Sequence, residues 1–264
     1  MDAALPRTHV VEIGIAGMTA LHLFGGPYVV ECGRRITVPE GSKRLLVFVA
    51  LHQGRIDRRH AAGTLWPVGG DERAAGNLRS ALWRLKGAGI ELIEADKHSI
   101  QLRHDTMVDV QVLRAWSGRI LTNSTEPGDL RLPTWSPDDV ELLPGWYDDW
   151  IIFERERTRQ RIMHAMETLS RRLAKLGRHA DAVEAALYAV RVDPLRESAQ
   201  SALVEVHVSE GNLTEARLAF AAYSDLLRDE LGVTPGREIT RLVQIQSPTR
   251  AVGKANTSLP SPVA

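Results

Sequence analysis

The chain has 264 residues, of which 44% are hydrophobic and 25% charged, so a chain disordered over most of its length is excluded and one large core or two ordinary ones are expected. Lys and Arg balance Asp and Glu at 33 each, and Cys32 is the only cysteine, which rules out an internal disulfide. No apolar run approaches the roughly 20 residues that span a bilayer, and the start of the chain lacks a basic region followed by an apolar one, so we expect no signal peptide and a cytoplasmic protein.

The charges are not spread evenly along the chain. Residues 1–108 contain 14 Lys and Arg against 11 Asp and Glu, whereas residues 109–264 contain 19 against 22. A basic excess of this size does not by itself predict a nucleic-acid partner, because phosphates are bound by a local patch of positive charge and not by a domain average.

Short strands are predicted at the start of the first part. The segments ALHLF, YVVEC and ITVP lie between residues 20 and 39, and turns at Gly25–Pro27 and Gly33–Arg35 separate them. This arrangement predicts an antiparallel meander.

Two helices are expected after these strands. Ser42–Leu51 is apolar enough for a buried helix, and Asp57–Leu65 gives a second one with Asp57 as its N-cap. The second helix ends at Trp66-Pro67, because proline cannot continue a helix. A short loop then leads into the next segment.

A third helix is predicted over Asp71–Gly89. Asp71 can accept hydrogen bonds from the free amides of the first turn, and Gly87 and Gly89 can end the last one. One face repeats apolar residues at helical spacing and is expected to be buried. Its members are Ala75, Leu78, Leu82 and Leu85.

The opposite face of this third helix offers hydrogen-bond donors and no carboxylate. Its members are Arg73, Gly76, Asn77, Ser80, Trp83 and Arg84, with Arg79 and Lys86 on the flanks. Arginine can bind guanine bidentately, asparagine can bind adenine, and serine or lysine can bind phosphate, so this set suits a recognition helix in the major groove of DNA. The alternative is an ordinary amphipathic helix with a solvated basic face.

A β-hairpin is predicted directly after the third helix. Glu91–Ala95 and Ser99–Leu102 are strand-like, and Asp96-Lys97-His98 forms the turn between them. Three helices followed by a hairpin is the order of a winged helix-turn-helix. Lys97 and His98 would then lie at the tip of the wing, where it meets the neighbouring groove or phosphates, with an ordinary charged turn as the alternative.

From Val108 onward the pattern is helical. Helices are expected over Asp109–Leu121, Asp148–Leu176, His179–Val192, Leu195–Ser209 and Leu213–Glu230. The interval 123–137 is rich in Pro, Gly, Ser and Thr and is expected to be a loop. Residues 247–264 are polar and contain Ser and Pro, so a disordered tail is expected there.

The later helices contain an internal repeat. Four pairs of matching residues are separated by 34 positions, which is the tetratricopeptide period. The pairs are Leu169 and Leu203, Gly177 and Gly211, Ala182 and Ala216, and Ala185 and Ala219. Small residues at helix crossings and glycine at the turn suit stacked helix-turn-helix units.

With these motifs in place, the chain resembles the Streptomyces antibiotic regulatory proteins, whose second part is called the bacterial transcriptional activator domain. The resemblance rests on LHLFGGPYVVECGRR, GSKRLLVFVAL and NLRSALWRLK in the first part, and on LLPGWYDDW, ERERTRQR and DELGVTPGREITRL in the second. It implies an α+β winged helix-turn-helix of the OmpR/PhoB-like type followed by an all-α tetratricopeptide-like domain. The expected divisions are an extension over 1–19, the winged helix over 20–108, the activator domain over 109–246 and the tail over 247–264.

The resemblance also implies a function. A member of this family would activate transcription of secondary-metabolite genes by binding direct repeats of double-stranded DNA upstream of promoters, associating with itself there and recruiting RNA polymerase. It implies base or phosphate contacts for Asn77, Arg79, Ser80 and Arg84, and a polymerase-facing loop formed by Pro67, Val68, Gly69 and Gly70. Larger members append an ATPase domain, whereas this sequence has no G-x-x-x-x-G-K-[ST] and reads as a short form.

Two other classes of function are alternatives to this interpretation. An enzyme is disfavoured, because the histidines show no H-E-x-x-H spacing and Cys32 has no histidine near it in the sequence, so no catalytic residue, metal or cofactor is expected. A protein-interaction scaffold that uses the helical repeats without DNA binding is the main alternative. Trp146, Tyr147 and Trp150 are interpreted as core, with a ligand pocket as the alternative.

Overall fold

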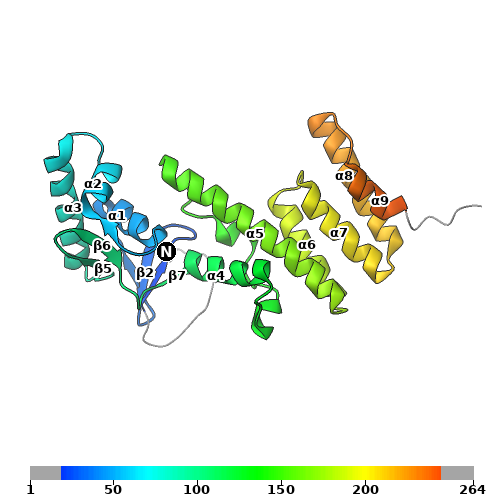
Figure 1. Ribbon diagram of the computed structural model, residues 1–264, viewed down its shortest axis with the longest axis horizontal. Helices are drawn as coiled ribbons and strands as arrows, with labels where there is room; N and C mark the ends of the chain where they lie inside the picture. Colours follow the sequence, from blue (N-terminus) through cyan, green and yellow to red (C-terminus); the bar gives the residue numbers. More distant parts are fainter. Residues whose placement is uncertain (1–18, 245–264) are drawn as a thin grey trace, which may run out of the picture.

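The computed structural model describes residues 19–244, so the expected extension over 1–19, apart from Thr19, and the expected tail over 247–264 lie outside the described residues. The strands are β1 (Ala20–His22), β2 (Tyr28–Glu31), β3 (Arg34–Thr37), β4 (Ile56–Asp57), β5 (Ile93–Ala95), β6 (Ser99–Leu102) and β7 (Met107–Val108). The helices are α1 (Glu40–Leu51), α2 (Arg58–Leu65), α3 (Gly70–Gly87), α4 (Asp109–Thr122), α5 (Asp149–Lys175), α6 (His179–Val192), α7 (Glu197–Glu210), α8 (Leu213–Leu231) and α9 (Arg237–Gln244), and two 3₁₀ turns are η1 (Pro127–Leu130) and η2 (Pro137–Val140). The molecule is elongated, with the strands and α1 to α3 at one end, α4 and α5 in the middle and α6 to α9 at the other end (Figure 1).

The first three strands form the antiparallel meander that their turns predict. Leu21 in β1 pairs with Val29 in β2, and both side chains are buried. The free edge of β1 takes up β7 in parallel, with Val108 beside Leu21, which gives the strand order β3-β2-β1-β7. The sequence pattern does not predict β7, because two residues are too few for an alternation to be visible.

The three helices and the hairpin of the first part are present in the predicted order. Asp57 is the N-cap of α2, as predicted, and its carboxylate accepts the N–H groups of Arg59 at 2.8 Å and His60 at 3.0 Å. The hairpin consists of β5 and β6, and β4 joins it by pairing Ile56 with Ile100. This second sheet, in the order β4-β6-β5, ties the hairpin to the start of α2.

The start of α3 differs from the prediction. The helix begins at Gly70, and the residue before it is Gly69, whose φ of 106° is in the left-handed region that favours glycine. Asp71 therefore lies inside the first turn and does not cap the helix. Its carboxylate accepts a hydrogen bond from the guanidinium of Arg59 on α2 at 3.4 Å.

The buried stripe of α3 is also rotated relative to the prediction, because two of its four members are shifted by one residue. It consists of Ala74, Leu78, Ala81 and Leu85, whereas Ala75 and Leu82 are half-buried. The reason is the position of α1, which packs close to Ala81, so that the hydroxyl of Ser42 donates a hydrogen bond to the Ala81 carbonyl at 2.9 Å. A small side chain at position 81 allows this close approach.

The helices of the second part stack in sequence order, as the internal repeat predicts. The helix pairs α5–α6 and α7–α8 are each joined at a glycine with positive φ, 74° at Gly177 and 83° at Gly211. Ala182 and Ala216, one at the same place in the second helix of each pair, are buried. The additional helix α9 packs against α7 and α8 and is not predicted by the periodicity.

The interval 123–137 is not a loose loop. It contains η1, whose Asp129 carboxylate pairs with the guanidinium of Arg119 on α4 at 2.7 Å. Further along, the Trp135 ring packs edge-on against Trp116 on α4 and Tyr188 on α6, with centroid distances of 5.9 Å and 5.2 Å. Composition alone indicates a loop here, but these tertiary contacts fix it to two helices.

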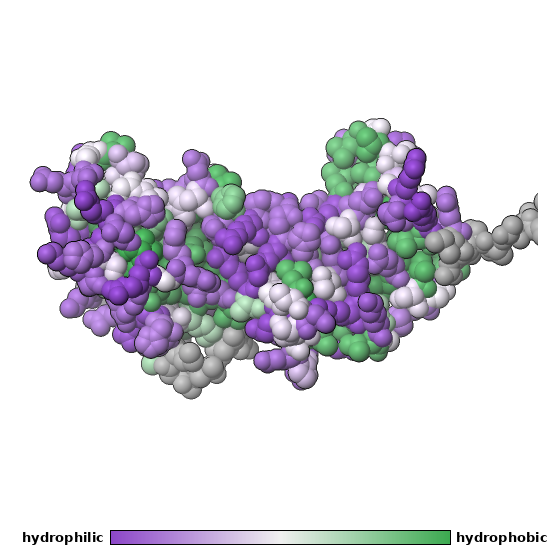
Figure 2. Space-filling view, viewed as in Figure 1, coloured by the Kyte–Doolittle hydropathy of each residue, from purple (hydrophilic) through white to green (hydrophobic). Residues whose placement is uncertain are grey.

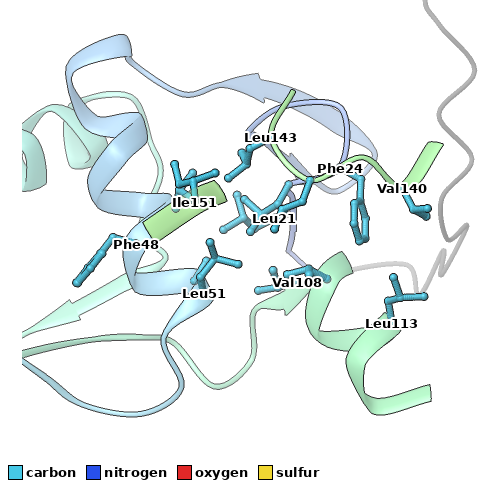
Figure 3. Packing of buried hydrophobic residues seen from close by; sticks show 14 of the residues in the cluster. Leu21, Phe24, Phe48, Leu51, Val108, Leu113, Val140, Leu143 and Ile151 are labelled. Carbon is cyan, nitrogen blue, oxygen red and sulfur yellow. The ribbon is translucent and has the colours of Figure 1, made fainter. Parts of the chain in front are cut away.

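The core does not divide at the predicted boundary between residues 108 and 109. One continuous hydrophobic cluster extends from the first strands into α5 and the helices beyond it. Figure 3 shows Leu143 and Ile151 from the second part among Leu21 and Phe48 from the first. The two parts of the chain therefore share a core.

Polar contacts reinforce this junction. The buried carboxylate of Asp109, at the start of α4, accepts the backbone N–H groups of Leu23 at 2.8 Å and Phe24 at 3.1 Å. Arg44 on α1 forms an ion pair with Asp148 at the N-cap of α5. These contacts hold α4 and α5 against β1 and α1.

The three aromatic residues before and at the start of α5 have different environments. The Trp150 ring packs edge-on against Phe48 with centroids 5.4 Å apart, and Trp146 is half-buried against the same cluster, as a core role predicts. Tyr147 is 80% exposed, so the prediction of a core role is wrong for this residue.

Candidate nucleic-acid interface

The outward face of α3 presents nearly all the side chains that the sequence predicts for it. Asn77 is half-buried, and the exposed members are Arg73, Arg79, Ser80, Trp83, Arg84 and Lys86. Trp83 is 76% exposed, which is unusual for so large an apolar side chain on a helix with a well-packed opposite face. Basic and aromatic groups therefore project together from one helix.

The rotation of the buried stripe places two of these residues at the edge of the face. Asn77 and Arg84 lie on the side next to α1, and Arg84 donates a hydrogen bond from Nη2 to the Gly41 carbonyl at 3.1 Å. A guanidinium has five N–H donors, so this bond leaves Arg84 able to contact a further acceptor. The centre of the face is formed by Arg79, Ser80 and Trp83.

The face is not free of carboxylates, contrary to the prediction. Asp71 and Glu72 are exposed in the first turn of α3. Acidic residues in the first turn and the basic residues Arg84 and Lys86 in the last turn both interact favourably with the helix dipole. The positive charge is therefore concentrated in the later turns of the helix.

Lys97 and His98 lie in a hairpin turn that is held by side-chain hydrogen bonds, and both residues are exposed. The carboxylate of Asp96 accepts the backbone N–H groups of His98 and Ser99, each at 2.7 Å, and the Ser99 hydroxyl at 2.9 Å. These hydrogen bonds, with that from His98 the largest cause, hold the pKa of Asp96 well below its usual range. Arg55, beside β4, adds an ion pair to the same carboxylate.

A groove of about 570 Å³ lies between α2, α3 and this turn. Two of its cations, Arg79 and Lys97, are among the predicted contact residues, and two others, Arg58 and Arg59 at the start of α2, are not. Arg58 is oriented by a hydrogen bond from Nη1 to the Asp96 carbonyl at 2.9 Å. The groove thus brings cations from three separate elements together.

The positions of Arg58 and Arg59 in the sequence give some indication of their role. Both directly follow the predicted N-cap of the second helix, and Arg55 precedes it. The sequence does not reveal that β4 pairs with β6, and this pairing places the start of α2 beside the hairpin turn. Asp71 and Glu72 line the same groove, and Asp71 pairs with Arg59 at 3.4 Å on an exposed surface, where such a pair contributes little.

The segment predicted to face polymerase, which follows the half-buried Trp66 and ends at the first residue of α3, is exposed. Its residues are Pro67, Val68, Gly69 and Gly70. Val68 is 82% exposed and offers an apolar contact to a partner. The φ of 106° favours glycine at position 69, and a Cβ there would lie 2.6 Å from the Cδ of Arg73, so that this exposed side chain would have to move.

Hydrophilic side chains predominate over the end of the molecule that α2, α3 and the hairpin form (Figure 2). Within residues 19–244, no group of three or more His, Cys, Asp or Glu is placed to hold a metal ion. Over the same residues, no helix combines the length and the apolar character needed to cross a bilayer. Exposed guanidinium, ammonium, hydroxyl and indole groups suit contacts to phosphates and to base edges.

Comparison with known proteins assigns the second part of the chain to a family. The model of the bacterial transcriptional activator domain matches residues 100–245, from β6 to just beyond α9. Among solved structures, Mycobacterium tuberculosis EmbR in complex with a low affinity phosphopeptide has a similar fold, with a TM-score of 0.58 and 16% sequence identity over 86% of this chain. The present chain spans 64% of the length of that one. None of the curated proteins matches the sequence. Since the family match covers more than half of the chain, this protein belongs to the bacterial transcriptional activator domain family, as its sequence motifs imply.

Proposed function

We propose that this protein is a DNA-binding transcriptional activator in which residues 20–108 form a winged helix-turn-helix and residues 109–246 form the activator domain. The observation that carries the proposal is the grouping of exposed cations from α2, α3 and the hairpin turn around one groove. In a winged helix, the third helix reads the major groove and the wing contacts the neighbouring groove or phosphates. The order β1-β2-β3-α1-β4-α2-α3-β5-β6 and the family assignment support this arrangement.

The exposed side chains suit different roles in such a complex. Arg79 and Ser80 at the centre of the α3 face are placed for base or phosphate contacts, and Trp83 for apolar contact with thymine methyl groups or sugars. Arg73, Asn77, Arg84 and Lys86 lie around this centre and suit backbone contacts that fix the register of the helix. Lys97 and His98 at the wing tip, with Arg58 beside them, would hold phosphates across the groove.

The proposed partners are double-stranded DNA and RNA polymerase. Two protomers would bind direct repeats near a promoter of secondary-metabolite genes in the cytoplasm, with repeats about 10–11 base pairs apart so that both recognition helices reach one face of the duplex. A direct repeat requires a head-to-tail relation between protomers. The exposed Pro67–Gly70 loop, with Val68 at its surface, is the proposed contact to polymerase.

The direct test is a binding titration of the full chain with fluorescent DNA from upstream of neighbouring genes, at two salt concentrations. We expect Arg79→Ala to weaken binding by about 1–3 kcal/mol if it contacts a base, and more uniformly across sequences if it contacts phosphate. The matched control is Arg171→Ala, which removes an arginine of α5 that pairs with Glu205 in the helical part.

Two results would contradict the proposal. One is an affinity that does not fall with rising salt, since phosphate contacts release counterions. The other is equal binding by Arg79→Ala, Arg171→Ala and the wild type. A five-base-pair insertion between the repeats should also weaken binding, because it turns one recognition helix to the far side of the duplex.

A further inference from the structure

A second cleft lies in the helical part, away from the proposed DNA-binding surface. It has a volume of about 410 Å³ and is bounded by η2, α5 and α6. Its apolar lining includes Val140, Leu142 and Ile162, which are almost fully buried, and Val192. The volume lies within the range of pockets that take drug-sized ligands.

The polar lining of this cleft is mainly arginine. Arg155, Arg159 and Arg191 contribute three guanidinium groups, against the carboxylates of Asp138 and Glu141. Asp138 pairs with Arg191 at 3.4 Å, and both side chains are largely exposed, so this pair is weak and easily exchanged. Arg159 pairs with Glu156 at 3.0 Å and with Asp193 at 3.6 Å. Within residues 19–244, the arginine of this lining without a carboxylate partner is therefore Arg155.

Arg155 is the unusual member of this set. Its Nε donates to the Leu142 carbonyl at 2.8 Å, and its Nη2 donates to the Leu143 and Trp146 carbonyls at 2.5 Å and 3.0 Å. In the described part of the chain, no ion pair involves Arg155, and no acceptor is found for its Nη1. A half-buried positive charge that has two N–H donors left and no carboxylate partner is a ready site for an oxyanion.

We propose that this cleft binds a small organic anion with an apolar body, and that Arg155 holds its anionic head. Arg159 and Arg191 add positive charge along the cleft, and the aliphatic side chains receive the apolar part of the ligand. Tyr188 also lines the cleft, and its buried hydroxyl has no hydrogen-bond partner within residues 19–244. A ligand acceptor that reached this hydroxyl would satisfy it.

Ligand binding at Arg155 would act on the junction between the two parts of the chain. The segment that Arg155 holds also contacts the β1–β2 turn, since Gly25 donates its N–H to the Glu141 carbonyl at 3.2 Å and Leu143 donates to the Leu23 carbonyl at 3.1 Å. A ligand that draws the guanidinium into the cleft would loosen this segment. A consequent change in operator affinity rests on the proposed DNA-binding function, whereas ligand binding itself does not.

The test uses the full chain and two fluorescent probes that share one apolar body. Anilinonaphthalene sulfonate carries an anionic head, and N-phenylnaphthylamine lacks it. We expect saturable binding of the sulfonate at one site, about tenfold or more tighter than the uncharged probe, which corresponds to a charge-assisted hydrogen bond of about 1.4 kcal/mol or more. No DNA is present, so failure of this test is distinguishable from failure of the proposed function.

Three variants locate the site. Arg155→Gln should reduce sulfonate affinity about tenfold and the affinity for the uncharged probe much less. If Arg155→Gln melts early because three carbonyls lose their donor, Arg159→Gln provides the same test at another arginine that lines the cleft, with an expected loss of about threefold. Arg171→Gln is the matched control, because its side chain is 39% exposed and ion-paired, and that of Arg159 is 38% exposed and ion-paired. Equal affinity for the two probes, or an equal effect of Arg159→Gln and Arg171→Gln, would overturn the proposal.

Discussion

The shared core makes a quantitative prediction for Leu143. Its side chain is fully buried at the junction, between residues of β1 and the start of α5 (Figure 3). Leu143→Ala removes three carbon atoms from a site that packed neighbours on both sides keep from collapsing, so we expect a loss of about 2–5 kcal/mol in the free energy of unfolding. For a protein of this size the melting temperature should fall by roughly 4–20 °C. Alanine can adopt the backbone φ of 49° as leucine does, and the three hydrogen bonds made by the backbone of residue 143 do not involve its side chain.

Hydrogen exchange measured by mass spectrometry on the full chain shows where the stability is lost. Peptides from β1–β2 and from residues 140–152 should lose protection from exchange together in Leu143→Ala, because both segments pack into the same core. Leu176→Ala, at an exposed leucine after α5, should stay within about 0.5 kcal/mol of the wild type. If β1–β2 kept wild-type protection while 140–152 lost it, the two parts would be independent units and the shared core would carry no cooperativity.

The remaining predictions concern other parts of the first half and its junction. Burial raises the pKa of Asp109 to about 7, although backbone N–H groups donate to its carboxylate, whereas the pKa of an unfolded aspartate is about 3.9. Between these two pH values the native state binds more protons than the unfolded state. The free energy of unfolding should therefore fall as pH rises from about 4 to 7. Asp109→Asn should remove this pH dependence, and thermal melts of both proteins at pH 5 and pH 8 check it. A wild type that gained stability relative to the variant between pH 5 and pH 8 would contradict the prediction. Gly69→Ala should cost about 1–3 kcal/mol, since φ is 106° and the new Cβ would clash with Arg73, whereas Gly87→Ala, which meets no atom within 4 Å, should not destabilise α3 in a thermal melt. A fragment ending at Val108 lacks the Asp109 carboxylate and the cover of α5, so we expect it to lose near-ultraviolet circular dichroism and protection from exchange, and a fragment with native protection would contradict this.

Local signals predicted much of the fold. Asp57 caps α2 because a carboxylate at the N-cap accepts amides of its own first turn, and the Asp96 turn forms for the same local reason. The 34-residue repeat predicts Gly177 and Gly211 at the turns between helices, because the positive φ that ends a helix is a local requirement that glycine meets. The strands β4 and β7 have two residues each and owe their existence to partners more than 40 residues away, so no local pattern reveals them.

Most of the residues predicted for the site are exposed on α3 and at the hairpin turn, but their arrangement differs from the prediction in detail. The stripe of α3 is rotated because α1 packs against the small Ala81, and a helical pattern with alanine at 74, 75 and 81 does not distinguish the two rotations. That rotation moves Arg84 toward the Gly41 carbonyl. Arg58 and Arg59 were missed because their place beside the hairpin turn depends on β4. Tertiary contacts therefore decide which cations share a surface.

The junction also limits how this protein can be recombined with its relatives. If residues 19–108 were replaced by the corresponding part of a relative, Leu142, Leu143 and Ile151 of this chain would face a foreign core. Asp148 would also lose its ion pair with Arg44. A chimera keeps the native packing and the Asp109 hydrogen bonds only if two stretches are transferred together, residues 19–109 and the segment from about 137 to 151. The unit that can be transplanted is therefore discontinuous in the sequence, although the fold places its two pieces side by side.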